Sequence, residues 1–154
     1  MPPKQVAIAM SGGIDSAVAA ALLKNQGYKV FGITMKLYSR REENPAGLAK
    51  QVAESMGIPH YVIDLRRPFQ RQVIKPFCTE YGRGRTPNPC IACNQYIKFG
   101  LLLDKALNMD ADYLATGHYA RIEPDPSGYR LLKGIDPGKD QSYFLYTLGQ
   151  EQLR

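Results

Sequence analysis

The 154-residue sequence contains no apolar run approaching the roughly 20 residues that a helix needs to cross a bilayer. Its first residues, Met1 to Gln5, lead into a strand-like segment without the apolar core of a signal peptide. These two absences predict a cytoplasmic protein that does not act in a membrane. Internal repeats and low-complexity segments are also missing. At 154 residues and 44% hydrophobic, the chain has the size and apolar content of one globular domain, which we therefore expect.

Cysteine is scarce, and the 3 in the chain are Cys78, Cys90 and Cys93. An odd count in a reducing compartment argues against a disulfide framework. Cys90 and Cys93 form a C-x-x-C pair, which can bind zinc, join an iron-sulfur cluster with a third ligand from Cys78 or further along the chain, or relay sulfur. We favour the relay, because only two cluster ligands are clearly placed, and we expect Cys78 to be a buried small side chain.

Basic residues outnumber acidic ones, which gives a net charge of +6 and a pI near 9.3. This surplus permits a polyanionic partner but does not require one, so clustering is the better indicator. Arg66, Arg67 and Arg71 form one cluster, and Arg83 and Arg85 precede the cysteine pair. The first cluster is also consistent with a solvated helix start.

The most informative motif follows the apolar run Val6 to Ala9, where a glycine pair opens an alanine-rich stretch. This order predicts a strand, a glycine loop and a helix, which together present backbone N–H groups to a phosphate. The loop lacks the lysine of a kinase-type P-loop and the G-x-G-x-x-G of a dinucleotide fold. We expect its serine hydroxyls to add donors and Asp15 to hold Mg²⁺. The candidate phosphate-binding residues are Ala9, Met10, Ser11, Gly12, Gly13, Ile14, Asp15 and Ser16.

Spelled S-G-G-x-D-S, this loop resembles the pyrophosphate loop of the N-type ATP pyrophosphatases. The resemblance implies that the cofactor is ATP, that AMP is transferred to a carbonyl oxygen and that pyrophosphate is released. A glycine-rich turn that serves packing alone is the competing interpretation.

Strand patterns alternate with helix patterns along the chain, which predicts an α/β fold on a doubly wound parallel sheet, with a hairpin inserted after the fourth strand. Ligands of such folds lie at the carboxyl ends of the strands, where the glycine loop also lies. The expected strands cover residues 6–9, 28–35, 60–65 and 112–116, and the hairpin covers 119–122 and 129–132.

Helices are expected between these strands and at the end of the chain. Ile14, Val18 and Leu22 form the apolar face of the first helix. Asn44 caps the second, and Pro76 must kink or break the third. The helical patterns cover residues 14–26, 45–56, 69–81 and 143–154.

Three further motifs are Gly84 to Asn94 with Ile97 to Phe99, Ala115 to Tyr119, and Lys139 to Leu145. Together with the glycine loop, and in this order, they closely resemble the tRNA-specific 2-thiouridylases over essentially the whole chain. The resemblance implies a substrate, the wobble uridine of tRNAs for Lys, Glu and Gln. It also implies a reaction in which ATP adenylates the C2 oxygen of the uracil and sulfur then displaces AMP.

The same resemblance assigns roles to individual residues. Cys93 matches the nucleophile, and Met35 and Gly117 join the glycine loop in the ATP site, with Met35 against adenine. A cysteine desulfurase or a sulfur-relay protein is implied as the sulfur donor. The residues implied to contact the target nucleotide or its tRNA are Asn88, Pro89, Cys90, Lys139, Asp140 and Gln141.

We expect the Cys93 thiolate to be favoured by Arg83, by Arg85 and by the N-terminus of a helix that begins near Asn94. The two histidines have different expected roles. His118 either polarises a substrate or is a packed imidazole, and His60 is structural.

The sequence departs from the family pattern in two places. Aspartate is usual where Cys90 stands, and residues 38–44 form a shorter segment than usual. The family also has a later second cysteine, a central domain and a β-barrel. Residues 1–154 are therefore expected to be an N-terminal catalytic domain that ends before these parts.

Two other functions are consistent with the loop. Another N-type ATP pyrophosphatase would amidate a small carboxylate and would need no cysteine. A non-catalytic nucleotide-binding module would need the loop but not Asp15 as a metal ligand.

Overall fold

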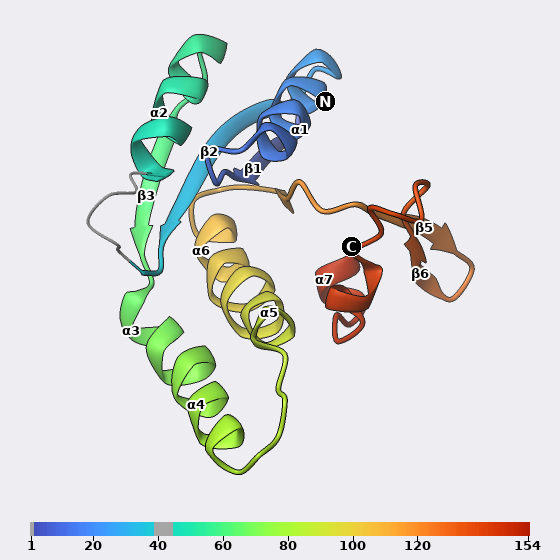
Figure 1. Ribbon diagram of the computed structural model, residues 1–154. Helices are drawn as coiled ribbons and strands as arrows, with labels where there is room; N and C mark the ends of the chain where they lie inside the picture. The colour runs from blue at the N-terminus through green and yellow to red at the C-terminus, as the bar shows by residue number, and fades with distance from the viewer. Residues whose placement is uncertain (1, 39–44) are drawn as a thin grey trace. The chain divides into compact units, whose positions relative to one another are not determined.

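The computed structural model describes residues 2–38 and 45–154, and Figure 1 shows how their elements follow one another. Contacts divide the chain into two compact units. The first contains Met1–Arg66 and Leu103–Gly117, and the second contains Arg67–Leu102 and His118–Arg154. None of the described helices is long and apolar enough to cross a membrane.

The first unit is built on a four-stranded parallel sheet with the order β3-β2-β1-β4. Its strands are β1 (Gln5–Ala9), β2 (Lys29–Lys36), β3 (His60–Asp64) and β4 (Tyr113–Ala115). Both faces of β2 are covered, because residues 30–34 are all buried. These features confirm the predicted α/β fold, and each predicted strand ends within about one residue of its expected limits.

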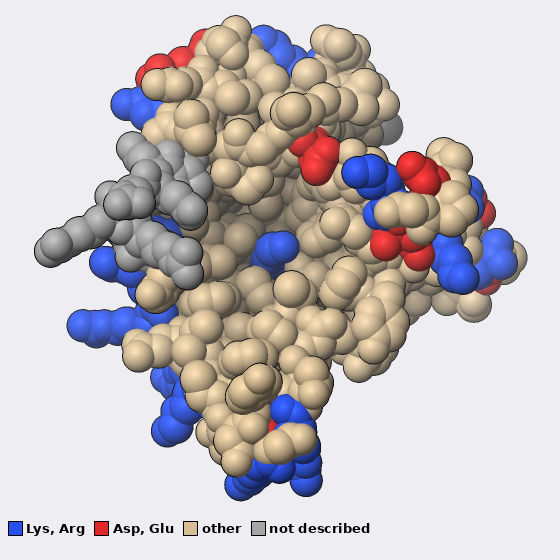
Figure 2. All heavy atoms as spheres, viewed as in Figure 1, with Lys and Arg blue, Asp and Glu red and all other residues tan. Residues whose placement is uncertain are grey.

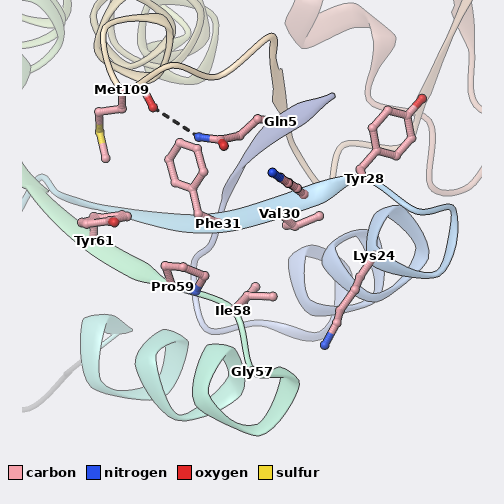
Figure 3. Close-up of a pocket in the computed structure, with 11 residues that line it drawn as sticks. Gln5, Lys24, Tyr28, Val30, Phe31, Gly57, Ile58, Pro59, Tyr61 and Met109 are labelled. Atoms are coloured by element: carbon pink, nitrogen blue, oxygen red, sulfur yellow. Dashed lines mark hydrogen bonds between the residues drawn. The ribbon is translucent and has the colours of Figure 1, made fainter. Parts of the chain in front are cut away.

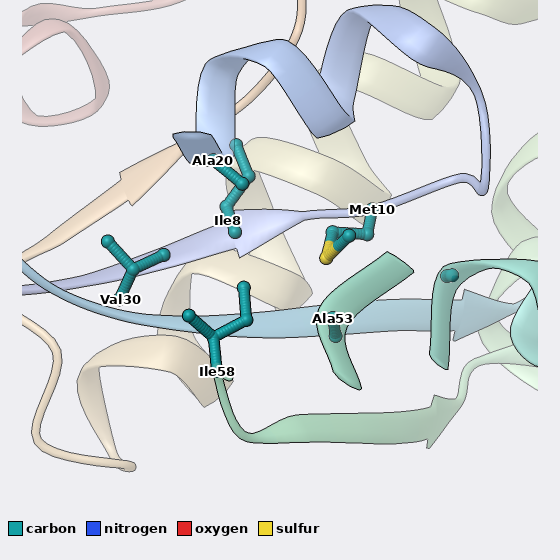
Figure 4. Close-up of a cluster of buried hydrophobic side chains, with 7 residues drawn as sticks. Ile8, Met10, Ala20, Val30, Ala53 and Ile58 are labelled. Carbon is teal, nitrogen blue, oxygen red and sulfur yellow. The ribbon is translucent and has the colours of Figure 1, made fainter. Parts of the chain in front are cut away.

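Helices α1 (Ile14–Asn25) and α2 (Pro45–Met56) pack against this sheet through small side chains. Ala20, Ala49 and Ala53 are fully buried, so both helices approach the strands closely (Figure 4). The predicted cap of α2, Asn44, lies outside the described residues. The core cluster consists of Ile8, Met10, Ala20, Val30, Ala49, Ala53 and Ile58.

The predicted apolar face of α1 is wrong. Ile14, Val18 and Leu22 are 81%, 50% and 55% exposed, whereas Ser16 and Ala20 on the same helix are buried. Small side chains let α1 lie closer to the sheet than branched ones would, and this packing overrides the periodicity of the larger residues.

An uninterrupted helical segment leads into the second unit. It consists of α3 (Arg66–Phe69), the π-helical turn η1 (Gln70–Ile74) and α4 (Lys75–Gly82). Pro76 does not break this helix, and the distortion takes the form of a π turn directly before the proline, which lacks an N–H donor. A second helical segment consists of α5 (Pro89–Ala92), the π-helical η2 (Cys93–Leu102) and α6 (Leu103–Leu107).

The chain after β4 forms an antiparallel pair, β5 (Ala120–Asp125) and β6 (Gly128–Lys133), which confirms the inserted hairpin. The predicted single helix over residues 143–154 is wrong. The structure has a 3-10 turn, η3 (Ser142–Leu145), and a separate short helix, α7 (Gln150–Leu153). Gly149 lies between them in an extended conformation and caps α7, so the first turn cannot continue into the second.

Candidate nucleotide loop and cysteine helix

The glycine loop lies where the strand order of the sheet reverses. β1 has β2 on one side and β4 on the other, so the chain leaves the sheet at two neighbouring points after β1 and β4. Ligands of open α/β sheets bind outside the carboxyl ends of the strands at such a switch point. Residues 10–13 therefore occupy the expected binding edge of the first unit.

Hydrogen bonds inside the loop fix its shape. Gly12 has a φ of 82°, which side chains rarely adopt, and it turns the chain from β1 toward α1. The Ser16 hydroxyl donates to the Gly13 carbonyl oxygen at 3.1 Å, and its oxygen accepts from the Ser11 N–H at 3.3 Å. Because Ser16 is 5% exposed and its hydrogen is used within the loop, it braces the loop, whereas Ser11 is exposed.

Gly117, just after β4, lies against the first turn of α1. A Cβ atom at this position would lie 2.8 Å from the Ser16 nitrogen and 2.9 Å from the Asp15 carbonyl carbon. Backbone atoms at those distances leave no room for a side chain, so the close approach requires glycine. The structure thus brings Gly117 to the glycine loop, and its contact with ATP stays a prediction.

The other residues of the predicted ATP site differ in how far their side chains are exposed. Ile14 and Asp15 are exposed in the first turn of α1, and Met35 is half-buried at the carboxyl end of β2. The Met10 side chain is 3% exposed inside the core, so Met10 can offer a ligand only its backbone. Asp15 presents a carboxylate beside the loop, and carboxylate oxygens are the ligands that Mg²⁺ prefers.

Thr34 and His60 hold the backbone at the start of the loop. The Thr34 hydroxyl donates to the Met10 carbonyl oxygen at 2.8 Å, and its oxygen lies 2.8 Å from His60 Nε2. Because the hydroxyl has one hydrogen, the proton of the second bond belongs to His60 Nε2. Burial, followed by nearby Lys50, lowers the pKa of His60 and keeps its imidazole neutral, in keeping with its expected structural role.

We expect Thr34→Val to lower the free energy of unfolding by about 1–3 kcal/mol, because the buried Met10 carbonyl and His60 both lose their partner. Thr34→Ser keeps the hydroxyl and is the matched control. Urea unfolding measures both variants. If Thr34→Val lowers the free energy of unfolding by no more than Thr34→Ser does, the hydroxyl has no stabilising role.

The cysteine pair lies on the second helical segment, which begins earlier than the sequence predicts. Asn88 Oδ1 accepts from the Cys90 N–H at 3.0 Å, so Asn88 caps a helix that begins at Pro89. The predicted start near Asn94 is wrong, and Asn94 is instead buried and donates to the Phe144 carbonyl at 3.0 Å. An asparagine followed by proline is the usual start signal and could have located the helix.

The surroundings of Cys93 raise its pKa, mainly through burial. Arg83 and Arg85, which were predicted to favour the thiolate, both pair with Glu80, at 2.8 and 2.6 Å. Cys93 also follows the first helical turn, Pro89–Ala92, rather than preceding it. The predicted stabilisation of the thiolate by these groups is therefore wrong, and burial keeps the thiol protonated near neutral pH.

Lys98 is a candidate functional residue that the sequence did not predict. It lies close enough to Cys93 to lower the pKa of the thiol and so partly opposes the effect of burial. In an α-helix, a residue five positions further on points about 140° away. In the π-helical η2, hydrogen bonds join residues five apart, which brings Lys98 round to the side of Cys93.

We expect Lys98→Met to slow the alkylation of Cys93 by iodoacetamide several-fold at pH 8, because loss of the cation raises the pKa of the thiol further. Lys105→Met removes an exposed lysine on the same helical segment and is the control. In the unaltered protein, the alkylation rate of Cys93 should still be increasing with pH at the ordinary pKa of cysteine, because the pKa of this thiol is raised. Peptide mapping separates Cys93 from the other cysteines, and equal rates in both variants would exclude Lys98.

The other cysteine predictions have mixed outcomes. Cys78 is exposed, so its prediction as a buried side chain is wrong. Within residues 2–38 and 45–154, no three His, Cys, Asp or Glu side chains are grouped so that they could hold a metal ion. Two cysteines are fewer than the four ligands typical of an iron-sulfur cluster, so we derive no step through a cluster.

His118 is packed beside an aromatic ring. Its ring centroid lies 5.9 Å from that of Phe99. Burial, assisted by nearby Lys98, lowers the pKa of His118 to about 4. The imidazole is therefore packed and neutral near pH 7, and a contact with substrate stays a prediction.

Two residues predicted to contact substrate hold a loop together. Asp140 accepts from the Gly134 N–H at 2.7 Å, which is the largest cause of the lowered pKa of its carboxyl. Gln141 accepts from the Tyr119 N–H at 3.0 Å. Lys139 is exposed. These bonds tie the segment after β6 to the start of the hairpin, and contacts with substrate stay a prediction.

A cavity of about 660 Å³ lies near the amino ends of β1, β2 and β3, away from the glycine loop (Figure 3). Phe31 and Tyr61 line it with their rings edge to face, 5.7 Å between centroids. Gln5 Nε2 donates to the Met109 carbonyl at 3.4 Å at its rim. None of its lining residues belongs to the four motifs, so this cavity is separate from the candidate nucleotide site.

Known proteins resemble this chain in sequence and in fold. A model of the tRNA methyl transferase HUP domain matches residues 4–154, which include every predicted site residue. The chain belongs to this family. A further relative is the tRNA-specific 2-thiouridylase MnmA of Dehalococcoides mccartyi, which is 54% identical over 96% of this chain and 43% of that protein. This identity confirms the resemblance to the tRNA-specific 2-thiouridylases.

Two solved structures resemble this HUP domain. One is a predicted subunit of tRNA methyltransferase from Methanocaldococcus jannaschii, with a TM-score of 0.55 and 24% identity over 74% of this chain and 52% of that one. The other is an NH3-dependent NAD synthetase from Campylobacter jejuni, with a TM-score of 0.50 and 18% identity over 72% of this chain and 46% of that one. At these identities the likeness shows the fold alone.

The HUP domain spans less than half of the curated relatives that it matches. It covers between 43% and 46% of the length of these 2-thiouridylases. More than half of each relative therefore lies outside the alignment.

Proposed function

We propose that the protein carries out ATP-dependent 2-thiolation of the wobble uridine in tRNAs for Lys, Glu and Gln, in the cytoplasm. The observation that carries the proposal is the glycine loop at the switch point of the sheet, closed by Gly117 against the first turn of α1. Glycine there lets the backbone approach a phosphate. The 54% identity to a 2-thiouridylase supports the choice of substrate.

The first step activates the base. The C2 oxygen of uracil attacks the α-phosphorus of ATP, the bond to the β-phosphate oxygen breaks, and pyrophosphate leaves. The loop N–H groups and the N-terminus of α1 hold the phosphates. The Asp15 carboxylate would hold Mg²⁺, which screens phosphate charge when bound. Uridine must leave its stack for C2 to be reached.

The second step transfers sulfur. A cysteine desulfurase or a sulfur-relay protein loads Cys93 as a persulfide, and its outer sulfur bonds to C2 while AMP leaves. The Cys90 thiolate then attacks the Cys93 sulfur, which breaks the S–S bond, releases 2-thiouridine and leaves a Cys90–Cys93 disulfide. A cellular thiol reductant restores the pair. The three-residue spacing on one helix and the exposure of Cys90 support this relay.

The test is pyrophosphate release by the full-length protein that carries this chain, with unmodified tRNA, ATP and a persulfide donor, followed by mass analysis of tRNA nucleosides. Release that needs tRNA and yields 2-thiouridine supports the proposal. Release with ammonia and a small carboxylate would favour an amidating synthetase instead. Methyl transfer to tRNA from S-adenosylmethionine, or nucleotide binding without turnover, would also replace the proposal.

A further inference from the structure

We infer that Arg67, Arg71 and Lys75, here called the basic stripe, form a contact surface for the phosphates of an RNA backbone. The inference rests on the proposed tRNA substrate and adds a binding surface outside the glycine loop and the cysteine pair. It assigns a role to an arginine cluster that the sequence alone leaves open between a polyanion site and a solvated helix start.

The geometry of the helical segment aligns these three side chains. They stand four residues apart in α3, η1 and α4, and all three are exposed. Val73, two residues from both Arg71 and Lys75, is only 2% exposed and so marks the opposite, packed side of the helix. Eight residues of helix span about 12 Å, long enough to lie along several successive phosphates.

The basic stripe has no acidic counterpart. Residues 65–79 contain no Asp or Glu, and no ion pair within the described part of the chain includes Arg67, Arg71 or Lys75. Figure 2 shows basic side chains projecting along the edge occupied by α3 and α4 in Figure 1, without acidic ones beside them. By contrast, carboxylate partners are present for Arg66, which directly precedes the stripe and pairs with Asp64, and for Arg83, Arg85, Arg121 and Arg130.

Like charges four residues apart destabilise a helix, so an unpaired basic row is unfavourable in the free protein. An external polyanion removes that repulsion and releases its own counterions, which favours binding. Tyr81, 65% exposed and stacked on Phe77 further along the same helix, adds an aromatic face of the kind on which unpaired bases stack. A row of cations followed by an exposed aromatic ring on the same helix suits RNA better than an acidic protein segment, which has no bases to stack.

The basic stripe is also tied to the cysteine helix. α5, which carries Cys90 and ends next to Cys93, packs against η1, which carries Arg71. Both belong to the second compact unit. RNA held on the basic stripe is therefore held by the same body that presents the cysteine pair.

The experiment compares equilibrium binding of an unmodified tRNA transcript, with uridine at the wobble position, to full-length protein carrying R67Q, R71Q and K75Q together. The control carries K50Q, K105Q and R130Q, which remove the same number of exposed charges elsewhere. We expect the stripe variant to bind about tenfold or more weakly at 100 mM salt, and its slope of log K against log salt to be shallower by about three. Thermal unfolding checks that both variants fold.

The outcomes separate this inference from the proposed function. Equal binding and equal slopes in both triple variants, or no binding of tRNA by the unaltered protein, would overturn the basic stripe. Thiolation of the transcript by the unaltered protein is measured in parallel. If thiolation is absent while the slope of the stripe variant is reduced, the proposed function fails and the RNA contact stands. If thiolation is present while the slopes are equal, the basic stripe alone fails.

Discussion

Cys93→Ser is expected to reduce 2-thiouridine formation by the full-length protein by about three orders of magnitude or more, while tRNA-dependent pyrophosphate release persists. A hydroxyl cannot carry the transferable sulfur and is a far weaker nucleophile near neutral pH. The defect therefore falls after adenylation. Mass analysis of tRNA nucleosides and a coupled pyrophosphate assay measure the two steps separately on the same samples.

Cys78→Ser is the matched control, because Cys78 is an exposed cysteine in the same unit with no part in the proposed relay. It should leave both steps unchanged. Ordinary thiolation by Cys93→Ser would remove Cys93 from the reaction. Stoichiometric iron bound after anaerobic reconstitution, and lost in both Cys90→Ser and Cys93→Ser along with thiolation, would replace the persulfide relay with a cluster.

The strands and the sheet topology could be predicted from the sequence because their signals are local. β1 and β2 are short apolar runs bounded by turn residues, and alternation with helices leaves a parallel sheet as the expected arrangement. The helix faces could not be predicted in the same way. On α1 the residues that pack are Ser16 and Ala20, and the sequence gives no reason to prefer them over Val18 and Leu22 until the distance to the sheet is known.

In the candidate site, too, local features could be predicted from the sequence and long-range contacts could not. The motif predicts the position of the glycine loop, and the family resemblance assigns Gly117 to the same site; the close approach of Gly117 to the first turn of α1 is visible only in the structure. The bond from Thr34 to the Met10 carbonyl depends on the pairing of β1 with β2, because β2 places the threonine beside the residue that opens the loop. Long-range pairing of this kind leaves no mark in a single sequence.

The chemical environment of Cys93 was the least predictable feature. The spacing predicts that Arg83 and Arg85 lie near the thiol, but both guanidinium groups form ion pairs with Glu80. The neighbouring charge that remains, Lys98, reaches Cys93 through a π-helical geometry that α-helical periodicity does not anticipate. Which carboxylate an arginine pairs with, and where a helix departs from α-helical pitch, both depend on the folded structure. Neither could therefore be predicted from the sequence.

Asp15→Asn is expected to lower the rate of tRNA-dependent pyrophosphate release by about a hundredfold or more, because it removes the carboxylate that we propose holds Mg²⁺, the ion that screens the charge of the reacting phosphates. The substitution keeps the size of the side chain, so the fit of Gly117 against the first turn of α1 is preserved. Residual activity should need more Mg²⁺ than the unaltered protein does. A pyrophosphate assay across a Mg²⁺ titration measures both effects.

Glu151→Gln provides a close control for the helix itself. Asp15 is the second residue of α1 after the cap Gly13, and Glu151 is the second residue of α7 after the cap Gly149. Each substitution removes a negative charge from a helix N-terminus, where such charges are stabilising, so both should lower stability slightly. Only Asp15→Asn should slow pyrophosphate release. A rate unaltered in Asp15→Asn, or lowered equally in both variants, would mean that the carboxylate of Asp15 acts on the helix and not on the nucleotide.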